Sequence, residues 1–209
     1  MARNLRSSCK LCRREGVKLM LKGARCESSK CALARRPYAP GVHGPGRPSR
    51  QTDYGKQLRE KQKAKRLYGI SETQFANYYK KAMKLKGDSG MNLVQLLELR
   101  LDNVIYRAGF AKSRASARQI VSHAHILVNN KPVNIPSYLV KSGDIVTVQE
   151  NKQNKSNWKT LSEDLKNHIA PSWLAVEPAK LVAKITSTPS AEELKEAFDP
   201  KLIIEFYSR

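Results

Sequence analysis

Apolar residues at helical spacing mark the middle of the chain, and the most sharply bounded helix begins after Ser71. Ser71 and Gln74 can form a capping box, with Ile70 and Phe75 as its hydrophobic staple. Gly87 provides the expected end. The predicted buried face consists of Phe75, Tyr78, Tyr79 and Ala82.

The preceding segment, residues 53–68, predicts a helix with a thin apolar stripe and a basic face. Asp53 is the expected N-cap and Gly69 the expected stop. Basic residues recur at three- and four-residue steps, at Lys56, Arg59, Lys63 and Arg66. Because such steps place side chains on one face, the spacing favours a phosphate-facing stripe over an ordinary exposed face.

Two further helical segments follow. Residues 92–108 carry a leucine-rich face and predict one or two helices, and Ser113 is the expected cap of the next helix. Lys112 precedes that helix, while Arg114 and Arg118 lie four residues apart on its polar face. The free amides and dipole of a helix N-terminus attract anions, so basic side chains there favour a phosphate site.

Short apolar runs after these helices predict strands, at residues 125–129, 131–134 and 145–148. The first two can close as a hairpin over Asn129 and Asn130, because asparagine tolerates the positive φ that such a turn needs. The final apolar run, residues 202–207, also predicts a strand. Helices and antiparallel strands together indicate an α+β fold.

The charge of the chain is strongly positive and unevenly distributed. There are 39 Lys and Arg against 18 Asp and Glu, a formal net charge of +21, and residues 1–66 hold 19 of the basic and 4 of the acidic residues. Such a field fits nucleic acid or an anionic membrane. The basic segment is too polar for the apolar face of a membrane-binding helix, so nucleic acid is favoured and no membrane partner is expected. A merely solvated basic face is the alternative.

Four cysteines lie in this basic segment with the spacing C-x2-C-x13-C-x4-C: Cys9, Cys12, Cys26 and Cys31. Two close pairs joined by a loop can surround one metal ion, so we expect a structural metal site. Four thiolates leave no position open for water or substrate, which argues against a catalytic zinc. Zinc is favoured over an iron–sulfur cluster, although both remain open because the spacing suits either.

Disulfides are the main alternative for these cysteines. They would need an oxidising compartment, yet the first twenty residues lack the apolar core of a signal peptide and the length of a membrane span. Free or redox-active thiols are the third alternative.

The segment after the last cysteine, residues 35–50, is rich in proline, glycine and arginine. Proline and glycine oppose regular hydrogen bonding, so we expect an extended arm that becomes ordered on a partner. His43 lies in this arm. A stacking or phosphate contact is favoured for it over metal ligation, because four cysteines already fill a tetrahedral site.

Residues 99–148 resemble the RNA-binding module named after small ribosomal subunit protein four, which also occurs in some tRNA synthetases and pseudouridine synthases. This resemblance rests on the runs Arg100–Phe110, Ser113–His123, Ile126–Asn129 and Gly143–Asp144. The flanks resemble the bacterial-type family of that ribosomal protein, in its four-cysteine form, over nearly the whole chain. Their motifs are Cys9–Gly16, Pro40–Gly44, Asp53–Lys63, Tyr68–Ser71 and Ile204–Arg209. Asn130 departs from the family, in which a glycine is usual.

The resemblance implies an α+β protein in three parts. They are a metal-bound knot with a basic arm at residues 1–48, a helical domain at 49–95 completed by 161–209, and an inserted helix-plus-antiparallel-strand RNA-binding module at 96–160. It also implies a non-enzymatic protein of the cytoplasmic ribosome. That protein would bind small-subunit (16S-type) ribosomal RNA and nucleate assembly of the subunit body. It would contact small-subunit ribosomal protein five, lie near the mRNA entry channel and influence translational accuracy.

The resemblance also implies a set of RNA-facing side chains. Arginine forks and other cations suit the clustered phosphates and 2′-hydroxyls of folded RNA. The residues carried over are Arg13, Arg14, Arg35, Arg36, His43, Arg47, Tyr54, Arg59, Lys63, Lys112, Arg114 and Arg118.

Two other functions remain as hypotheses. An RNA-modifying enzyme or targeting factor with the same module would need a large catalytic domain, but the rest of the chain is a knot, an arm and a small helical domain. His123 and His125 have no cysteine or acidic residue beside them in sequence to form a catalytic group. A zinc-dependent DNA-binding regulator would need a recognition helix after the cysteines.

Overall fold

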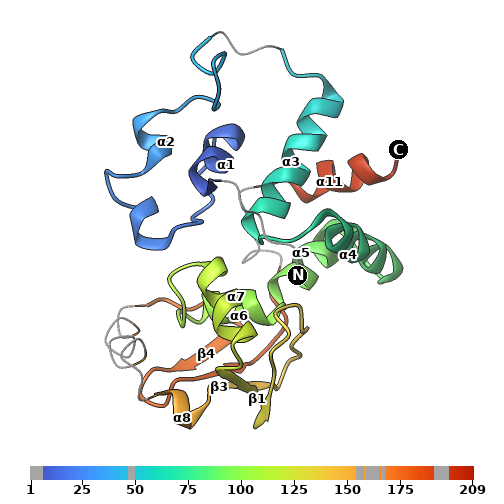
Figure 1. The fold of residues 1–209 in the computed structure, drawn as a ribbon. Helices are drawn as coiled ribbons and strands as arrows, with labels where there is room; N and C mark the ends of the chain where they lie inside the picture. Colours follow the sequence, from blue (N-terminus) through green and yellow to red (C-terminus); the bar gives the residue numbers. More distant parts are fainter. Residues whose placement is uncertain (1–6, 47–49, 154–157, 159–164, 166–167, 191–197) are drawn as a thin grey trace. The chain divides into compact units, whose positions relative to one another are not determined.

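The computed structural model describes residues 7–46, 50–153, 158, 165, 168–190 and 198–209 (Figure 1). It contains two compact units. We call Met1–Val94 with Lys195–Arg209 the helical unit, and Gln95–Leu194 the sheet unit.

The helical unit consists of two long helices and several shorter ones. Its helices are α1 (Ser8–Glu15), the 3-10 helix η1 (Gly23–Cys26), α2 (Ala32–Arg35), α3 (Asp53–Leu67), α4 (Glu72–Lys84), the first part of α5 (Ser89–Glu98) and α11 (Pro200–Tyr207). The Ser71 hydroxyl caps α4 by accepting from the backbone N–H of Gln74, as predicted. The cap of α3 is Thr52 rather than Asp53, one residue earlier than predicted.

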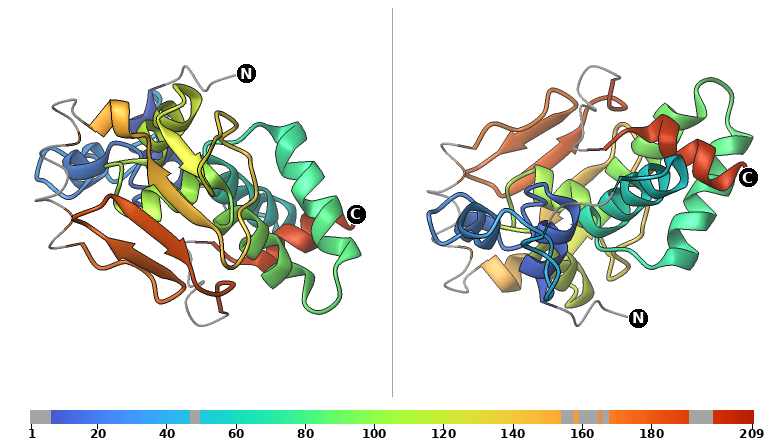
Figure 2. Two further views of the ribbon diagram at one scale, coloured as in Figure 1. Left: turned by 90° about the horizontal axis from the view of Figure 1, so that it is seen from below. Right: turned by 90° about the horizontal axis from the view of Figure 1, so that it is seen from above.

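The C-terminal run is a helix, not the predicted strand. A short apolar run fits either element, and the deciding signal is Asp199, whose carboxylate caps the helix, followed by Pro200 in its first turn. In both views of Figure 2, α11 (red) runs beside α3 (teal). Tyr207 stacks on Tyr79 of α4, with ring centroids 4.8 Å apart. The segment thus completes the helical unit as expected, but as a helix held by aromatic packing and not as a strand.

The sheet unit holds the rest of α5 and the strands. Its other elements are α6 (Leu101–Arg107), α7 (Arg114–Ser122), β1 (Ile126–Val128), β2 (Lys131–Pro132), β3 (Ile145–Val148), α8 (Glu150–Gln153), β4 (Leu174–Glu177) and β5 (Val182–Ile185). The strands pair antiparallel in the order β2-β1-β3-β5-β4. Alternate residues face the core, such as Val146 and Val148 of β3. Helices α6 and α7 cover that face (Figure 1), and Val104 and Val121 pack into the same core.

The hairpin between β1 and β2 turns where predicted. Asn129 and Asn130 have φ values of 49° and 62°, in the left-handed region. The Asn129 side chain also joins the turn to β3, because its carbonyl oxygen accepts from the N–H of Ile145 at 2.9 Å.

The sheet continues past the predicted end of the RNA-binding module at residue 160. Strand β5 pairs with β3 through Val146 and Ala183, and β4 forms the edge beyond it. Residues 174–185 therefore belong to the sheet unit and not, as expected, to the helical domain. Pairing between strands this distant in sequence leaves no local signal, which explains the misplaced boundary.

Candidate nucleic-acid interface

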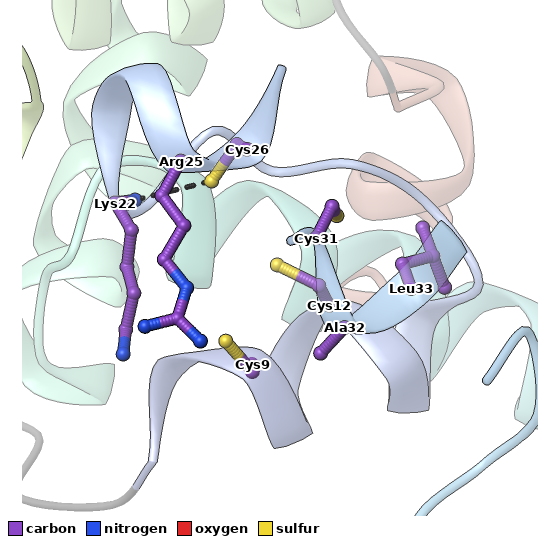
Figure 3. A pocket seen from close by; sticks show the side chains of 8 residues that line it. All are labelled: Cys9, Cys12, Lys22, Arg25, Cys26, Cys31, Ala32 and Leu33. Carbon is purple, nitrogen blue, oxygen red and sulfur yellow. Dashed lines mark hydrogen bonds between the residues drawn. The ribbon is translucent and has the colours of Figure 1, made fainter. Parts of the chain in front are cut away.

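The four cysteines come together around one small pocket of the helical unit (Figure 3). Cys9 and Cys12 lie on α1, Cys26 ends η1, and Cys31 precedes the first turn of α2. All four are free thiols. The folding of three short helices thus gathers the two predicted pairs.

The donor set of this pocket fits a thiophilic metal, but the sulfurs do not form a finished coordination site. Among the residues that the structure describes, no three His, Cys, Asp or Glu side chains lie close enough to hold a metal ion. Within the described part of the chain, the lining adds Lys22, Arg25, Ala32 and Leu33 and includes no carboxylate. Four sulfurs without competing oxygen donors are the ligands of structural zinc or of an iron–sulfur cluster.

The thiols of the pocket differ in their electrostatic surroundings. Burial raises the pKa of Cys12, and the nearby thiols of Cys26, Cys9 and Cys31 raise it further. The pKa of Cys31 is lowered, chiefly because the backbone N–H of Ala34 points at its sulfur. At Cys26 the sulfur accepts a hydrogen bond from the backbone N–H of Lys22 at 3.3 Å. At Cys31, the backbone amide therefore favours the thiolate form.

Arg13 fixes the start of the arm onto α1. Its guanidinium donates to the carbonyl oxygens of Tyr38 and Ala39, at 3.0 and 3.3 Å, and lies 4.9 Å from the Tyr38 ring centroid. Further along, backbone hydrogen bonds close turns at Gly44 and Gly46. The described part of the arm is therefore folded in turns rather than extended as predicted.

The other predicted contacts of the knot and arm lie at the surface. Arg14, Arg35, Arg36 and His43 are exposed. Arg35 donates to the carbonyl oxygen of Ser29 at 3.2 Å. Arg47 lies outside the described residues.

The cations of the basic stripe of α3 form a row of ion pairs, and their contact with phosphates stays a prediction. Arg59 and Arg66 both pair with Glu15 of α1, and Lys63 pairs with Glu60. Tyr54 is 51% exposed, and its ring lies 5.7 Å from that of Phe206. Carboxylates of the helical unit therefore neutralise part of the positive charge of the stripe.

Glu15, which the sequence reasoning missed, organises this stripe. Its side chain is fully buried; one carboxylate oxygen accepts from Arg59 and Arg66, and the other has no hydrogen-bond partner among the described residues. Burial raises the pKa of Glu15, against the opposing effects of Arg66, Arg59, Lys63 and Arg14. One buried carboxylate of α1 thus binds two cations of the α3 stripe, Arg59 and Arg66. The sequence offered one signal for it, because Glu15 is the only acidic residue among residues 1–26.

In the sheet unit, the start of α7, where a phosphate site is predicted, is a capped, basic helix terminus. The Ser113 hydroxyl accepts from the N–H of Ser116 at 3.2 Å. Lys112 is exposed. Arg114 donates to the side-chain oxygen of Asn103 at 2.7 Å, and Arg118 lies 3.5 Å from Asp102.

Two buried carboxylates hold these arginines in place. Glu98 binds Arg107 through two hydrogen bonds of 2.9 and 3.0 Å and lies 3.9 Å from Arg114. Asp102 binds the buried Arg100 with bonds of 3.0 and 2.7 Å. Asp102 is therefore the partner of two arginines, Arg100 and Arg118. The arrangement fixes guanidinium groups on α6 and α7.

Comparisons with known proteins match the whole chain. The family described as "Ribosomal protein S4/S9 N-terminal domain" matches residues 3–98, and the "S4 domain" matches residues 99–146. Relatives named small ribosomal subunit protein uS4 are 50% identical in Caldicellulosiruptor bescii, 49% in Ruminiclostridium cellulolyticum and 52% in Magnetococcus marinus. Each match covers 100% of both chains.

The chain belongs to the uS4 family. The resemblance found in the sequence is thereby confirmed at the level of the family. The uS4 family is structural and not enzymatic, which removes the alternative of an RNA-modifying enzyme. No helix in the described ranges combines the length and apolarity needed to cross a membrane.

Proposed function

We propose that this chain is a structural protein of the small ribosomal subunit, located in the cytoplasmic ribosome, that binds small-subunit (16S-type) ribosomal RNA. This conclusion rests on the uS4 relatives, which are 50% and 49% identical to the chain over its full length. The capped basic terminus of α7 and the exposed Arg14, Arg35 and Arg36 of the knot and arm are the surfaces that support it. The RNA is bound through its backbone and shape, because point charges and guanidinium forks suit clustered phosphates.

The finer roles follow from the family resemblance. The protein binds the RNA early and nucleates assembly of the subunit body. It contacts small-subunit ribosomal protein five, lies near the mRNA entry channel and influences translational accuracy together with neighbouring proteins. The twelve RNA-facing residues carried over from the family belong to the same proposal.

A filter-binding titration tests the RNA specificity. At fixed salt, small-subunit ribosomal RNA is compared with an unrelated RNA and with duplex DNA, and we expect clear preference for the first. Arg36→Gln, at an exposed arm residue, is expected to weaken binding severalfold. The matched control is Lys180→Gln, because Lys180 pairs with Glu177. Equal affinity for all three nucleic acids contradicts the proposal.

For the cysteine pocket we propose one structural zinc ion held by Cys9, Cys12, Cys26 and Cys31. The shared pocket, the four free thiols and the absence of carboxylate lining support this assignment. When bound, the metal would supply a rigid cross-link between α1, η1 and α2, worth on the order of 10 kcal/mol in comparable small sites. The four residues therefore anchor the knot and take no part in chemistry.

Metal analysis of the purified protein tests the assignment. We expect one zinc per chain, no visible absorption from an iron–sulfur cluster, and slow reaction of the native thiols with a thiol reagent. Cys12→Ser should lose the zinc and expose residues 8–35 to protease, while Ser28→Ala is the control. Metal-free protein with four rapidly reacting thiols would refute the site.

A further inference from the structure

We propose that the outer face of α4 is an additional RNA phosphate-binding surface of this protein. The surface, which we call the α4 lysine face, consists of Lys80, Lys81, Lys84 and Lys86. The inference rests on the proposed function as a ribosomal RNA binder and adds a site to it. None of these lysines is among the residues carried over from the family.

Helix geometry places the lysines opposite the core. Phe75, Tyr78 and Ala82 form the buried side of α4. With 100° between successive residues, Lys80, Lys81 and Lys84 project from the opposite side. All four lysines are exposed, and Lys86 follows just beyond the end of the helix. The uncharged Thr73 and Asn77 extend the same outer side, which therefore carries no acid.

The α4 lysine face differs from α3 in its lack of carboxylate partners. In α3, six cations lie within 4.0 Å of a carboxylate: Lys56, Arg59, Lys61, Lys63, Lys65 and Arg66. Among the described residues, no carboxylate comes that close to any of the four α4 lysines. Glu72, the acid of α4, instead faces α3 and accepts from Lys61 and Lys65.

The positions of the acidic residues determine which cations can attract an external polyanion. A paired cation has much of its field cancelled by the adjacent carboxylate, whereas four unpaired ammonium groups within seven residues add their fields. Lys80 and Lys84, one helical turn apart, repel each other. The helix dipole offsets some of this repulsion near the C-terminus of α4, at Lys81 and Lys84. A row of external phosphates would offset the rest.

The chemistry of the face favours a phosphate backbone, which the proposed function identifies as that of RNA, over a membrane surface. Ammonium groups are compact point charges that bind phosphates without demanding bidentate geometry. The adjacent Met83 and Leu85 are only about half exposed, at 48% and 50%, which gives too little apolar surface for insertion into a membrane. We therefore assign a backbone contact that carries no base specificity.

Lysine protection tests the contact directly on the full-length protein. The protein is treated with an amine-acylating reagent, alone and bound to small-subunit ribosomal RNA, and modified lysines are quantified by mass spectrometry. We expect Lys80, Lys81 and Lys84 to be modified in the free protein and protected at least severalfold in the complex. Lys180, paired and exposed, should react equally in both states.

A charge-removal series gives the energetic counterpart. Replacing Lys80, Lys81 and Lys84 by Gln is expected to weaken RNA binding roughly 10- to 100-fold. The slope of the logarithm of the binding constant against the logarithm of the salt concentration should become less steep by about 2 to 3. The control replaces Lys141, Lys180 and Lys201, which are also exposed, and removes the same net charge. Circular dichroism establishes that both variants are folded, and Lys84→Gln alone serves if the triple variant is not.

The outcomes separate the two proposals. If wild-type protein prefers ribosomal RNA but the α4 lysines stay reactive in the complex and the triple variant binds like its control, the α4 lysine face is refuted alone. If wild-type protein shows no preference for ribosomal RNA, the proposed function fails first.

Discussion

At the scale of single residues, the cations of this chain differ by the carboxylates beside them. Arg59 and Arg66 share the buried Glu15, and Lys61 and Lys65 share Glu72. These four cations position helices. Cations without such partners, like those of the α4 lysine face, are available to an external polyanion.

Glu72 makes the stability of the helical unit depend on pH. Burial alone would raise the pKa of Glu72, but hydrogen bonds from Lys61, Lys65 and Tyr207 outweigh it and lower the pKa to about 2. Since the folded-state pKa lies below the ordinary 4.5, the stabilisation is present above pH 4.5 and is lost as the pH falls towards 2. Glu72 is 46% exposed, so solvent screening reduces this contribution to on the order of 1 kcal/mol.

We therefore expect Glu72→Gln to lower the free energy of unfolding by about 1 kcal/mol at pH 7. The difference from wild type should shrink between pH 4.5 and pH 3, as measured by urea denaturation followed by circular dichroism. Tyr207→Phe, which removes one of three donors, should have a smaller effect. A pH-independent difference would contradict the assigned role of the carboxylate.

At the scale of elements, features set by neighbouring residues were predictable from the sequence. Features set by contacts between distant segments were not. The caps at Ser71 and Ser113 act within three residues, so the sequence placed α4 and α7 correctly. The pairing of β5 with β3 and the partners of Glu15 depend on contacts between distant segments, which leave no periodic pattern. The C-terminal apolar run was assigned to the wrong element because its length suits both a strand and a helix.

The candidate site was predictable to a similar extent. The cysteine spacing identified residues that do share a pocket, because two close pairs and a loop are a local arrangement. The basic stripe of α3 had the expected spacing, but its carboxylate partners come from α1 as well as from α3 itself. Charge in a sequence therefore shows where cations are, and not which of them are neutralised.

The turn at Asn129 and Asn130 gives a prediction at this scale. Left-handed backbone costs roughly 1–2 kcal/mol for an ordinary residue and more for a β-branched one, whereas glycine adopts it freely. Asn130→Val should lower the free energy of unfolding by about 1–2 kcal/mol, while Asn130→Gly should leave it within about 0.5 kcal/mol of wild type. Thermal and urea denaturation compare the variants. Equal stability of the Asn130→Val and Asn130→Gly proteins would show that the turn does not hold this conformation.

At the scale of the whole molecule, most of the net charge belongs to one unit. The helical unit has 26 Lys and Arg against 9 Asp and Glu, and the sheet unit has 13 against 9. Both units carry candidate RNA contacts, yet the helical unit dominates the long-range field. Association with RNA should therefore be strongly screened by salt.

For six to ten neutralised phosphates, the affinity for small-subunit ribosomal RNA should fall about 10^3- to 10^5-fold between 50 and 200 mM monovalent salt. Titrations at five or more salt concentrations give the slope. A fall of less than tenfold across this range would mean that few of the cations meet phosphates.

The hydrogen bond between Gln57 and Glu205 joins residues 148 positions apart, because α11 completes the unit begun by α3. This has a consequence for the order of synthesis. The sheet unit ends at Leu194 and can fold as soon as that residue has left the translating ribosome. Helix α3, made much earlier, must wait for α11 to cover its apolar side. We therefore expect the sheet unit in the middle of the chain to fold before the helical unit is complete.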